Sequence, residues 1–200
     1  MIETVLIGAS AGGMKALTAI LPALPKHFGM AVIVAQHLHA GSDGYLAEHL
    51  NRMCEVRVKD ADEKEAVEPG TVYIAPARYH LLVEEDRTLS LSGEPHVNYA
   101  RPSIDVLFES AVEVFEDRIV GIILTGANSD GAQGLAAIKK RGGTTVVQDP
   151  LNASSPEMPR AAIHAAQIDH ILTLPQITSF LRDLDRAEYD SKPIKTPHRA

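Results

Sequence analysis

The hydrophobic residues of this chain form short continuous runs that alternate with stretches of helical spacing. Continuous apolar runs that stop at glycine or polar residues are typical of strands buried on both faces. Such runs predict strands at residues 4–7, 30–35, 56–58, 71–75, 119–124, 144–147 and 168–172. Apolar residues at helical spacing predict helices over residues 14–21, 45–53, 103–115, 132–140, 159–166 and 175–186. This alternation predicts an α/β fold: a doubly wound, mostly parallel sheet with helices on both faces.

Three segments depart from this alternation. Residues 81–84 and 88–91, joined by a polar turn, predict one antiparallel hairpin. The charged connector at residues 60–68 is interpreted as a solvated loop.

A chain of 200 residues with 45% apolar content suffices for one core. We therefore expect a single domain over residues 1–186 and a flexible C-terminal tail over residues 187–200.

The charge balance narrows the possible partners. A net charge of −7 without any block of Lys or Arg argues against binding to nucleic acid or to an anionic membrane. Cys54 is the only cysteine, so an internal disulfide and a cysteine metal cluster are both excluded. No basic leader and no apolar stretch of membrane-spanning length is present. These features predict a soluble cytoplasmic protein without membrane insertion.

The most informative stretch is the turn GASAGG at residues 8–13, which follows the first predicted strand and precedes the first helix. Its small residues let the backbone bend sharply, so Ser10 is expected between the carboxyl end of a strand and the amino end of a helix. Unpaired N–H groups gather at such a point. Ser10 is therefore a helix cap, part of a phosphate cradle, or a nucleophile whose oxyanion those amides stabilise.

Two further candidates also stand where predicted strands end. His37 follows the run at residues 30–35, and Asp130 follows the run at residues 119–124. Because ligands of parallel sheets bind at the carboxyl ends of the strands, these side chains are expected at one edge together with Ser10. A base, a carboxylate that orients it and a hydroxyl are the parts of a serine hydrolase. The alternatives are a structural or surface histidine and an aspartate that caps a helix or a turn.

Other kinds of site fit less well. The spacing of Gly8, Ser10 and Gly12 matches the nucleophile elbow of lipases and esterases, but that elbow follows several strands and this turn follows the first. A dinucleotide site needs an acidic residue where His37 stands. His37, His39 and Asp43 could begin a metal site, but no further ligand cluster accompanies them. We therefore expect neither a metal nor a cofactor.

Eight short motifs occur in a fixed order along the chain. They are IGASAGG at residues 7–13, QH at 36–37, VYIAP at 72–76, RPSIDVLF at 101–108, LTG at 124–126, DG at 130–131, QDP at 148–150 and MPRAA at 158–162. Each motif is weak alone, but together they are highly specific. On the basis of these motifs, the chain resembles the catalytic domain of the CheB-type chemotaxis protein-glutamate methylesterases. The resemblance extends from Val5 to about Leu174.

The resemblance implies a function and a set of roles. It implies hydrolysis of glutamyl methyl esters, and deamidation of glutamines, on the cytoplasmic helices of methyl-accepting chemoreceptors. The family's nucleophile falls on Ser10, its histidine on His37 and its aspartate on Asp130, and no cofactor is involved. Backbone amides at Ala11 and Ala127 are expected to hold the oxyanion.

Two substitutions depart from the family's usual pattern. Ala11 stands where a threonine is usual, and the run before the aspartate reads Gly126-Ala127-Asn128 in place of Gly-Met-Gly. These changes leave open a receptor-binding relative without turnover. A serine esterase with another substrate is also open, because no feature of the sequence reads the substrate's side chains. The family's regulatory receiver domain is not expected within this chain, so regulation would come from a separate or fused domain.

The acidic net charge does not favour an acidic substrate. Arg78, Arg101 and Arg160 could offset it near the cleft, although ordinary surface ion pairs are the alternative.

Overall fold

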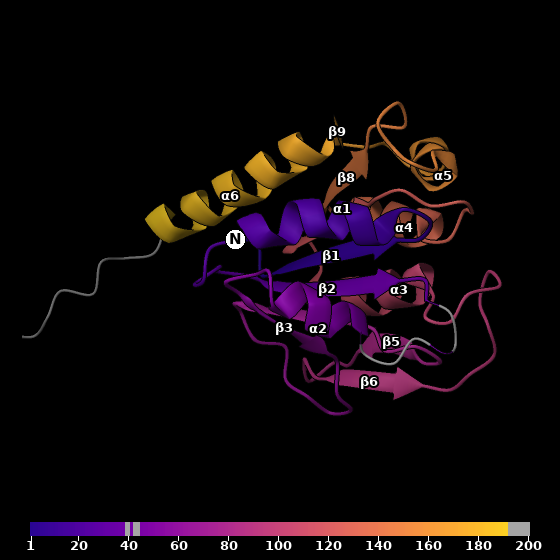
Figure 1. Cartoon of the computed structure of the whole chain (residues 1–200), viewed down its shortest axis with the longest axis horizontal. Coiled ribbons are helices and arrows are strands. Elements are labelled where there is room, and N and C mark those ends of the chain that lie inside the picture. The colour runs from indigo at the N-terminus through magenta and orange to yellow at the C-terminus, as the bar shows by residue number, and fades with distance from the viewer. Residues whose placement is uncertain (39–40, 42–44, 192–200) are drawn as a thin grey trace, which may run out of the picture.

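The computed structural model describes residues 1–38, 41 and 45–191, and in them a seven-stranded parallel sheet forms the centre of the molecule (Figure 1). The strand order is β3-β4-β2-β1-β7-β8-β9. The strands are β1 (Thr4–Ala9), β2 (Ala31–Gln36), β3 (Arg57–Asp60), β4 (Thr71–Ile74), β7 (Ile119–Ile123), β8 (Thr144–Gln148) and β9 (His170–Leu172). This arrangement confirms the predicted α/β architecture.

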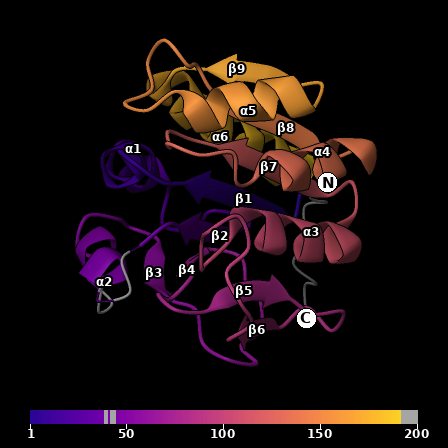
Figure 2. The ribbon, with the colours of Figure 1, turned by 90° about the vertical axis from the view of Figure 1, so that its right-hand side faces the viewer.

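Helices cover both faces of the sheet (Figure 2). One face packs against α1 (Gly13–Ile20), α2 (Tyr45–Asn51) and α6 (Leu174–Ser191). The other packs against α3 (Ile104–Phe115), α4 (Ala132–Lys140) and α5 (Glu157–Ala165). A short 3-10 turn, η1 (Leu21–Ala23), follows α1. Successive residues of β1 enter opposite cores, Val5 and Ile7 on one side and Leu6 on the other. Burial on both faces explains why this strand is a continuous apolar run.

The predicted hairpin is present as the antiparallel pair β5 (His80–Val83) and β6 (Leu89–Ser92). The connector before it is an irregular segment whose charged residues Asp62, Glu63 and Lys64 are exposed, as expected, but its backbone also pairs with the hairpin. Lys64 N–H donates to the Leu89 carbonyl at 2.7 Å, and Leu89 N–H donates to the Glu65 carbonyl at 2.7 Å. Ala61 is buried and Val67 packs against the same core. The charged side chains of this segment gave no indication that its backbone pairs with the hairpin.

The last helix is longer than predicted. It was expected to end at residue 186, but α6 continues to Ser191. Asp185, where fraying was expected, accepts a hydrogen bond from Gly29 N–H at 2.7 Å just before β2. This tertiary contact holds the helix where its polar sequence predicts a loose end. The rest of the predicted tail, residues 192–200, lies outside the described residues.

The topology brings three strand ends together. The chain adds β2 on one side of β1 and β7 on the other, so the strand order reverses at β1. Ligand sites of open α/β sheets lie outside the carboxyl ends of strands at such a reversal. In Figure 1 the arrowheads of β1 and β2 point to the right, and Figure 2 looks onto that side. The loops after β1, β2 and β7 all begin there.

Candidate active site

Ser10 lies in the tight turn between β1 and α1. Gly12, the N-cap of α1, has φ of 84°, a left-handed conformation that favours glycine. Ser10 N–H donates to the Thr125 carbonyl at 2.9 Å, and the Gln36 side-chain amide donates to the Ser10 carbonyl at 3.0 Å. The backbone that carries the hydroxyl is therefore fixed by the loop after β7 and by β2.

The His37 ring bridges the other two predicted site residues. Its Nδ1 atom is 3.2 Å from Ser10 Oγ, and its Nε2 atom is 2.8 Å from Asp130 Oδ2. His37 N–H continues the β1–β2 pairing by donating to the Ala9 carbonyl at 3.0 Å, which places the ring beside the serine turn. The structure thus brings Ser10, His37 and Asp130 together, with the His37 ring in contact with both of the others.

The carboxylate of Asp130 lies at the N-terminus of α3. It accepts hydrogen bonds from Ile104 N–H at 2.7 Å and from Asp105 N–H at 3.2 Å. The N-cap residue Ser103 donates its hydroxyl to the same carboxylate at 2.9 Å. The free amides and the positive dipole end of a helix favour an anion at this position.

The ionisation of Asp130 follows from these contacts. Burial raises the pKa of its carboxyl, but the hydrogen bonds donated to it, that from His37 first, outweigh burial and leave the pKa below the ordinary value. Asp130 is therefore an anion at neutral pH. It fixes the Nε2 proton of His37 and leaves the Nδ1 lone pair toward Ser10.

A second buried carboxylate lies close by. Asp105 accepts Gly134 N–H at 2.8 Å, and the Asn98 amide donates to both Asp105 at 2.8 Å and Asp130 at 3.2 Å. Burial above all, with a contribution from the charge of Asp130, raises the pKa of Asp105 to about 6. Asn98 thus bridges two carboxylates that repel each other.

The wall beside Ser10 requires a glycine. A Cβ atom on Gly126 would lie 1.9 Å from Met158 Sδ and 2.9 Å from Ser10 Cβ. Gly126 N–H also donates to the Ser155 carbonyl at 3.0 Å. The loop after β7 can approach the serine only without a side chain at this position.

The N–H groups expected to hold an oxyanion lie in exposed turns. Ala11 and Ala127 are both exposed, and within the described part of the chain neither N–H donates a hydrogen bond. Cys54 offers no competing nucleophile, because burial raises the pKa of its thiol to about 11.

Among the described residues, no group of three or more His, Cys, Asp or Glu side chains is placed to hold a metal ion. His39 and Asp43 of the alternative metal site lie outside those residues. Within the same residues, no helix is long and apolar enough to cross a membrane.

A cleft of about 380 Å³ opens beside His37. Its lining includes Asn128, Tyr99 and the positively charged Arg78 and Arg101. Arg160, the third basic residue considered from the sequence, does not line it. The cleft therefore carries positive charge in a chain whose net charge is −7.

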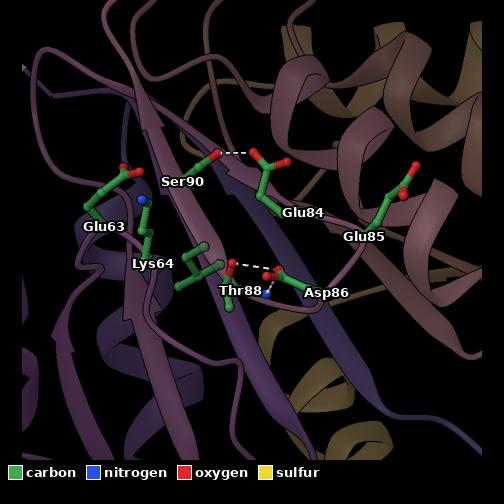
Figure 3. A pocket seen from close by; sticks show the side chains of 8 residues that line it. Glu63, Lys64, Glu84, Glu85, Asp86, Thr88 and Ser90 are labelled. Atoms are coloured by element: carbon green, nitrogen blue, oxygen red, sulfur yellow. Dashed lines mark hydrogen bonds between the residues drawn. The ribbon is translucent and has the colours of Figure 1, made fainter.

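A larger hollow of about 730 Å³ lies on the β5–β6 hairpin, and Figure 3 shows its acidic lining. Ser90 donates to Glu84, and the Thr88 hydroxyl donates to Asp86 at 2.7 Å. No residue lines both this hollow and the cleft beside His37. The larger hollow contains neither Ser10 nor His37 and is separate from the candidate site.

Sequence reasoning missed several residues of the site. Ser103 and Asp105 lie within the RPSIDVLF motif, and their place at the start of a predicted helix was a usable signal. Asn98 and Asn128 had no comparable signal, because their contacts arise from loops whose paths the sequence pattern does not determine.

Comparison with known proteins gives consistent matches. The model of the CheB methylesterase family matches residues 5–181. A Leptospira interrogans protein, provisionally named protein-glutamate methylesterase/protein-glutamine glutaminase, is 50% identical over 190 residues, which cover 95% of this chain and 98% of the relative. The Paraburkholderia xenovorans protein-glutamate methylesterase/protein-glutamine glutaminase is 42% identical over 179 residues; the match covers 88% of this chain and only 49% of that protein.

A solved structure agrees with these matches. The crystal structure of the Thermotoga maritima CheB methylesterase catalytic domain has a TM-score of 0.88 and 33% sequence identity to this chain. The match covers 92% of this chain and 99% of that one.

We predict that Ser103→Ala lowers the free energy of unfolding by about 1–2 kcal/mol, because it removes a helix cap and a hydrogen bond to a buried carboxylate. Denaturant titration measures this loss. The exposed Ser129, in the Asp130 loop, provides the control Ser129→Ala, expected to change stability by less than about 0.5 kcal/mol. Equal losses in the two variants would contradict the role of Ser103.

We predict that Asp105→Asn becomes more stable relative to the wild type as pH rises. The pKa of Asp105 is raised from 3.8 to about 6, so the folded state binds this proton more tightly than the unfolded state. The free energy of unfolding that the protonated Asp105 carboxyl contributes to the wild type is therefore present at low pH. It is lost as pH rises from about 4 to about 6.

The stability difference between Asp105→Asn and the wild type should grow by about 2 kcal/mol across that window and then level off. Urea titrations at several pH values measure it. Any packing cost of the amide does not depend on pH, so a flat difference would refute the assigned ionisation.

Proposed function

Because the chain belongs to the CheB methylesterase family, we propose that it hydrolyses glutamyl methyl esters on chemoreceptor helices in the cytoplasm and releases methanol. Deamidation of receptor glutamines, with release of ammonia, is proposed to use the same site. The observation that carries the proposal is the position of His37, 3.2 Å from the Ser10 hydroxyl and 2.8 Å from the Asp130 carboxylate.

In the first half of the proposed reaction, Ser10 attacks the ester carbonyl. His37 Nδ1 takes the hydroxyl proton as the Oγ–carbon bond forms. The resulting imidazolium holds protons on both ring nitrogens, and the ionised Asp130 stabilises it. His37 then gives the Nδ1 proton to the leaving methoxide, which departs as methanol and leaves a glutamyl ester on Ser10.

In the second half, water takes the place of the Ser10 hydroxyl. His37 Nδ1 removes a proton from water as the water oxygen bonds to the acyl carbon. The bond to Ser10 Oγ then breaks, and His37 returns the proton to Ser10. The substrate leaves as a free glutamate, and the enzyme is restored without a cofactor.

The oxyanion of each tetrahedral intermediate is proposed to lie against the backbone N–H groups of Ala11 and Ala127. Ala11 follows Ser10 in its turn, and Ala127 follows Gly126, whose backbone lies against Ser10. A donor of this kind contributes on the order of 3 kcal/mol to transition-state stabilisation. The Ala11 substitution leaves this backbone donor in place.

The cleft fits a substrate with acidic neighbours around the ester. Arg78 and Arg101 line it, so a helix that carries free glutamates meets positive charge there. Tyr99 is fully exposed at φ 62°, a strained conformation for a tyrosine. Two hydrogen bonds between Val97 and Ala100 close this turn. A bulky aromatic held in this way is suited to contact a partner helix.

A receptor-binding relative without turnover is the weaker proposal, because the hydroxyl, ring and carboxylate retain hydrogen-bond geometry. An esterase with a different substrate keeps the same mechanism. A panel of small esters tested beside methylated receptor separates this possibility from the proposed substrate.

We predict that Ser10→Ala lowers methanol release from methylated receptor at least about a thousandfold while the protein remains folded. Circular dichroism verifies the fold, and gas chromatography measures methanol. Ser90→Ala is the matched control, because Ser90 lines the separate acidic hollow and should keep full activity. Wild-type rates in folded Ser10→Ala would rule out the proposed nucleophile.

We predict that Tyr99→Ala raises KM for methylated receptor about fivefold to tenfold with little change in kcat. The exposed ring supports no core contact, so stability should be unchanged. KM for a small methyl ester should change less, because such a substrate has no helix to contact the exposed ring. Ile171→Ala, on the edge strand β9, is an apolar control. Unchanged KM for the receptor would remove Tyr99 from the docking surface.

A further inference from the structure

Asn128 contacts the same histidine nitrogen as the candidate nucleophile. Its Nδ2 atom lies 3.2 Å from His37 Nδ1, and Ser10 Oγ also lies 3.2 Å from that atom. The other end of the Asn128 amide is fixed, because its Oδ1 atom accepts Asp130 N–H at 3.1 Å. A carbonyl oxygen bound to that N–H leaves the NH₂ group facing the ring.

This contact is favourable in only one state of the ring. With the Nε2 proton donated to Asp130, Nδ1 has a single lone pair in the ring plane. Asn128 donates to that lone pair and shares it with the Ser10 hydroxyl. When Nδ1 gains a proton, an N–H group faces an NH₂ group and neither can accept. Asn128 therefore favours the neutral imidazole over the imidazolium.

We propose that Asn128 is a positioning residue that holds His37 in its neutral form and extends activity toward lower pH. As a statement about catalysis, the inference rests on the proposed function, since His37 must be the general base. A glycine at this position, usual in the resembled family, has no side chain and cannot make the contact. The side chain at 128 thus sets the pH at which this chain's base becomes available.

Other charged groups near the ring act on it in every variant alike. Asp130 favours the protonated ring from the Nε2 side, and Asp105 adds negative charge behind it. Across the cleft, the positive charges of Arg78 and Arg101 oppose protonation. Asn128→Asp keeps an acceptor for Asp130 N–H, so its difference from the wild type reports the contact with Nδ1, whereas the Ala and Gly variants lose both contacts.

The test compares Asn128→Ala, Asn128→Gly and Asn128→Asp with the wild type. The midpoint of the acidic limb of kcat/KM for methyl-ester hydrolysis should rise by about 0.5–1 pH unit in the Ala and Gly variants, as expected for loss of one hydrogen bond. It should rise further in Asn128→Asp, whose carboxylate accepts Nδ1–H. Ser129→Ala should leave the midpoint unchanged.

An NMR titration of labelled histidine gives a second readout that needs no substrate. The chain has nine histidines, and a His37→Gln spectrum identifies the His37 signal. The same order of midpoints, wild type lowest and Asn128→Asp highest, supports the inference. If the NMR midpoints shift but no variant or wild type releases methanol, the proposed function fails while the ring contact stands.

Two results would overturn the inference. One is an Ala or Gly variant whose His37 midpoint stays at the wild-type value or falls. The other is a loss of turnover on the high-pH plateau without any movement of the acidic limb, which would assign Asn128 to the substrate. Thermal melting confirms that each variant is folded, and the Ala and Gly variants act as duplicates if one fails.

Discussion

The structure of the site depends on one buried anion, the Asp130 carboxylate. An ionised carboxylate removed from water is costly unless hydrogen bonds replace its hydration. Here the donors come from separate parts of the chain: the first amides and N-cap of α3, the Asn98 loop and the His37 ring. These donors meet at the same charge, so the hydrogen bond that orients the His37 ring is part of the solvation of the Asp130 carboxylate.

The nucleophile is held in a different way, by hydrogen bonds to its own backbone. Ser10 donates its N–H to Thr125 in the loop after β7, and its carbonyl accepts a hydrogen bond from Gln36. The absence of a side chain on Gly126 lets that loop reach the serine. The hydroxyl therefore has a defined position before any substrate arrives. Rigid placement of the reacting group is what shortens the search for a reactive geometry.

The sequence pattern predicted the sheet because burial on both faces leaves a direct mark, a continuous apolar run such as that of β2. It also led to Ser10, His37 and Asp130, since each follows such a run and the ends of parallel strands meet. It could not reach Asn98 or Asn128, whose contacts depend on loop paths. It also gave no sign that the backbone of the exposed connector pairs with the hairpin, because only the charged side chains there are visible in the sequence pattern.

The tether between Asp185 and Gly29 has a consequence for where the two described ends of the chain lie. It draws α6 toward the amino ends of the strands, and the first residues of the chain lie at that rear side as well (Figure 1). The first residues of the chain and the end of α6 therefore lie on the side of the sheet opposite the strand ends that carry Ser10, His37 and Asp130.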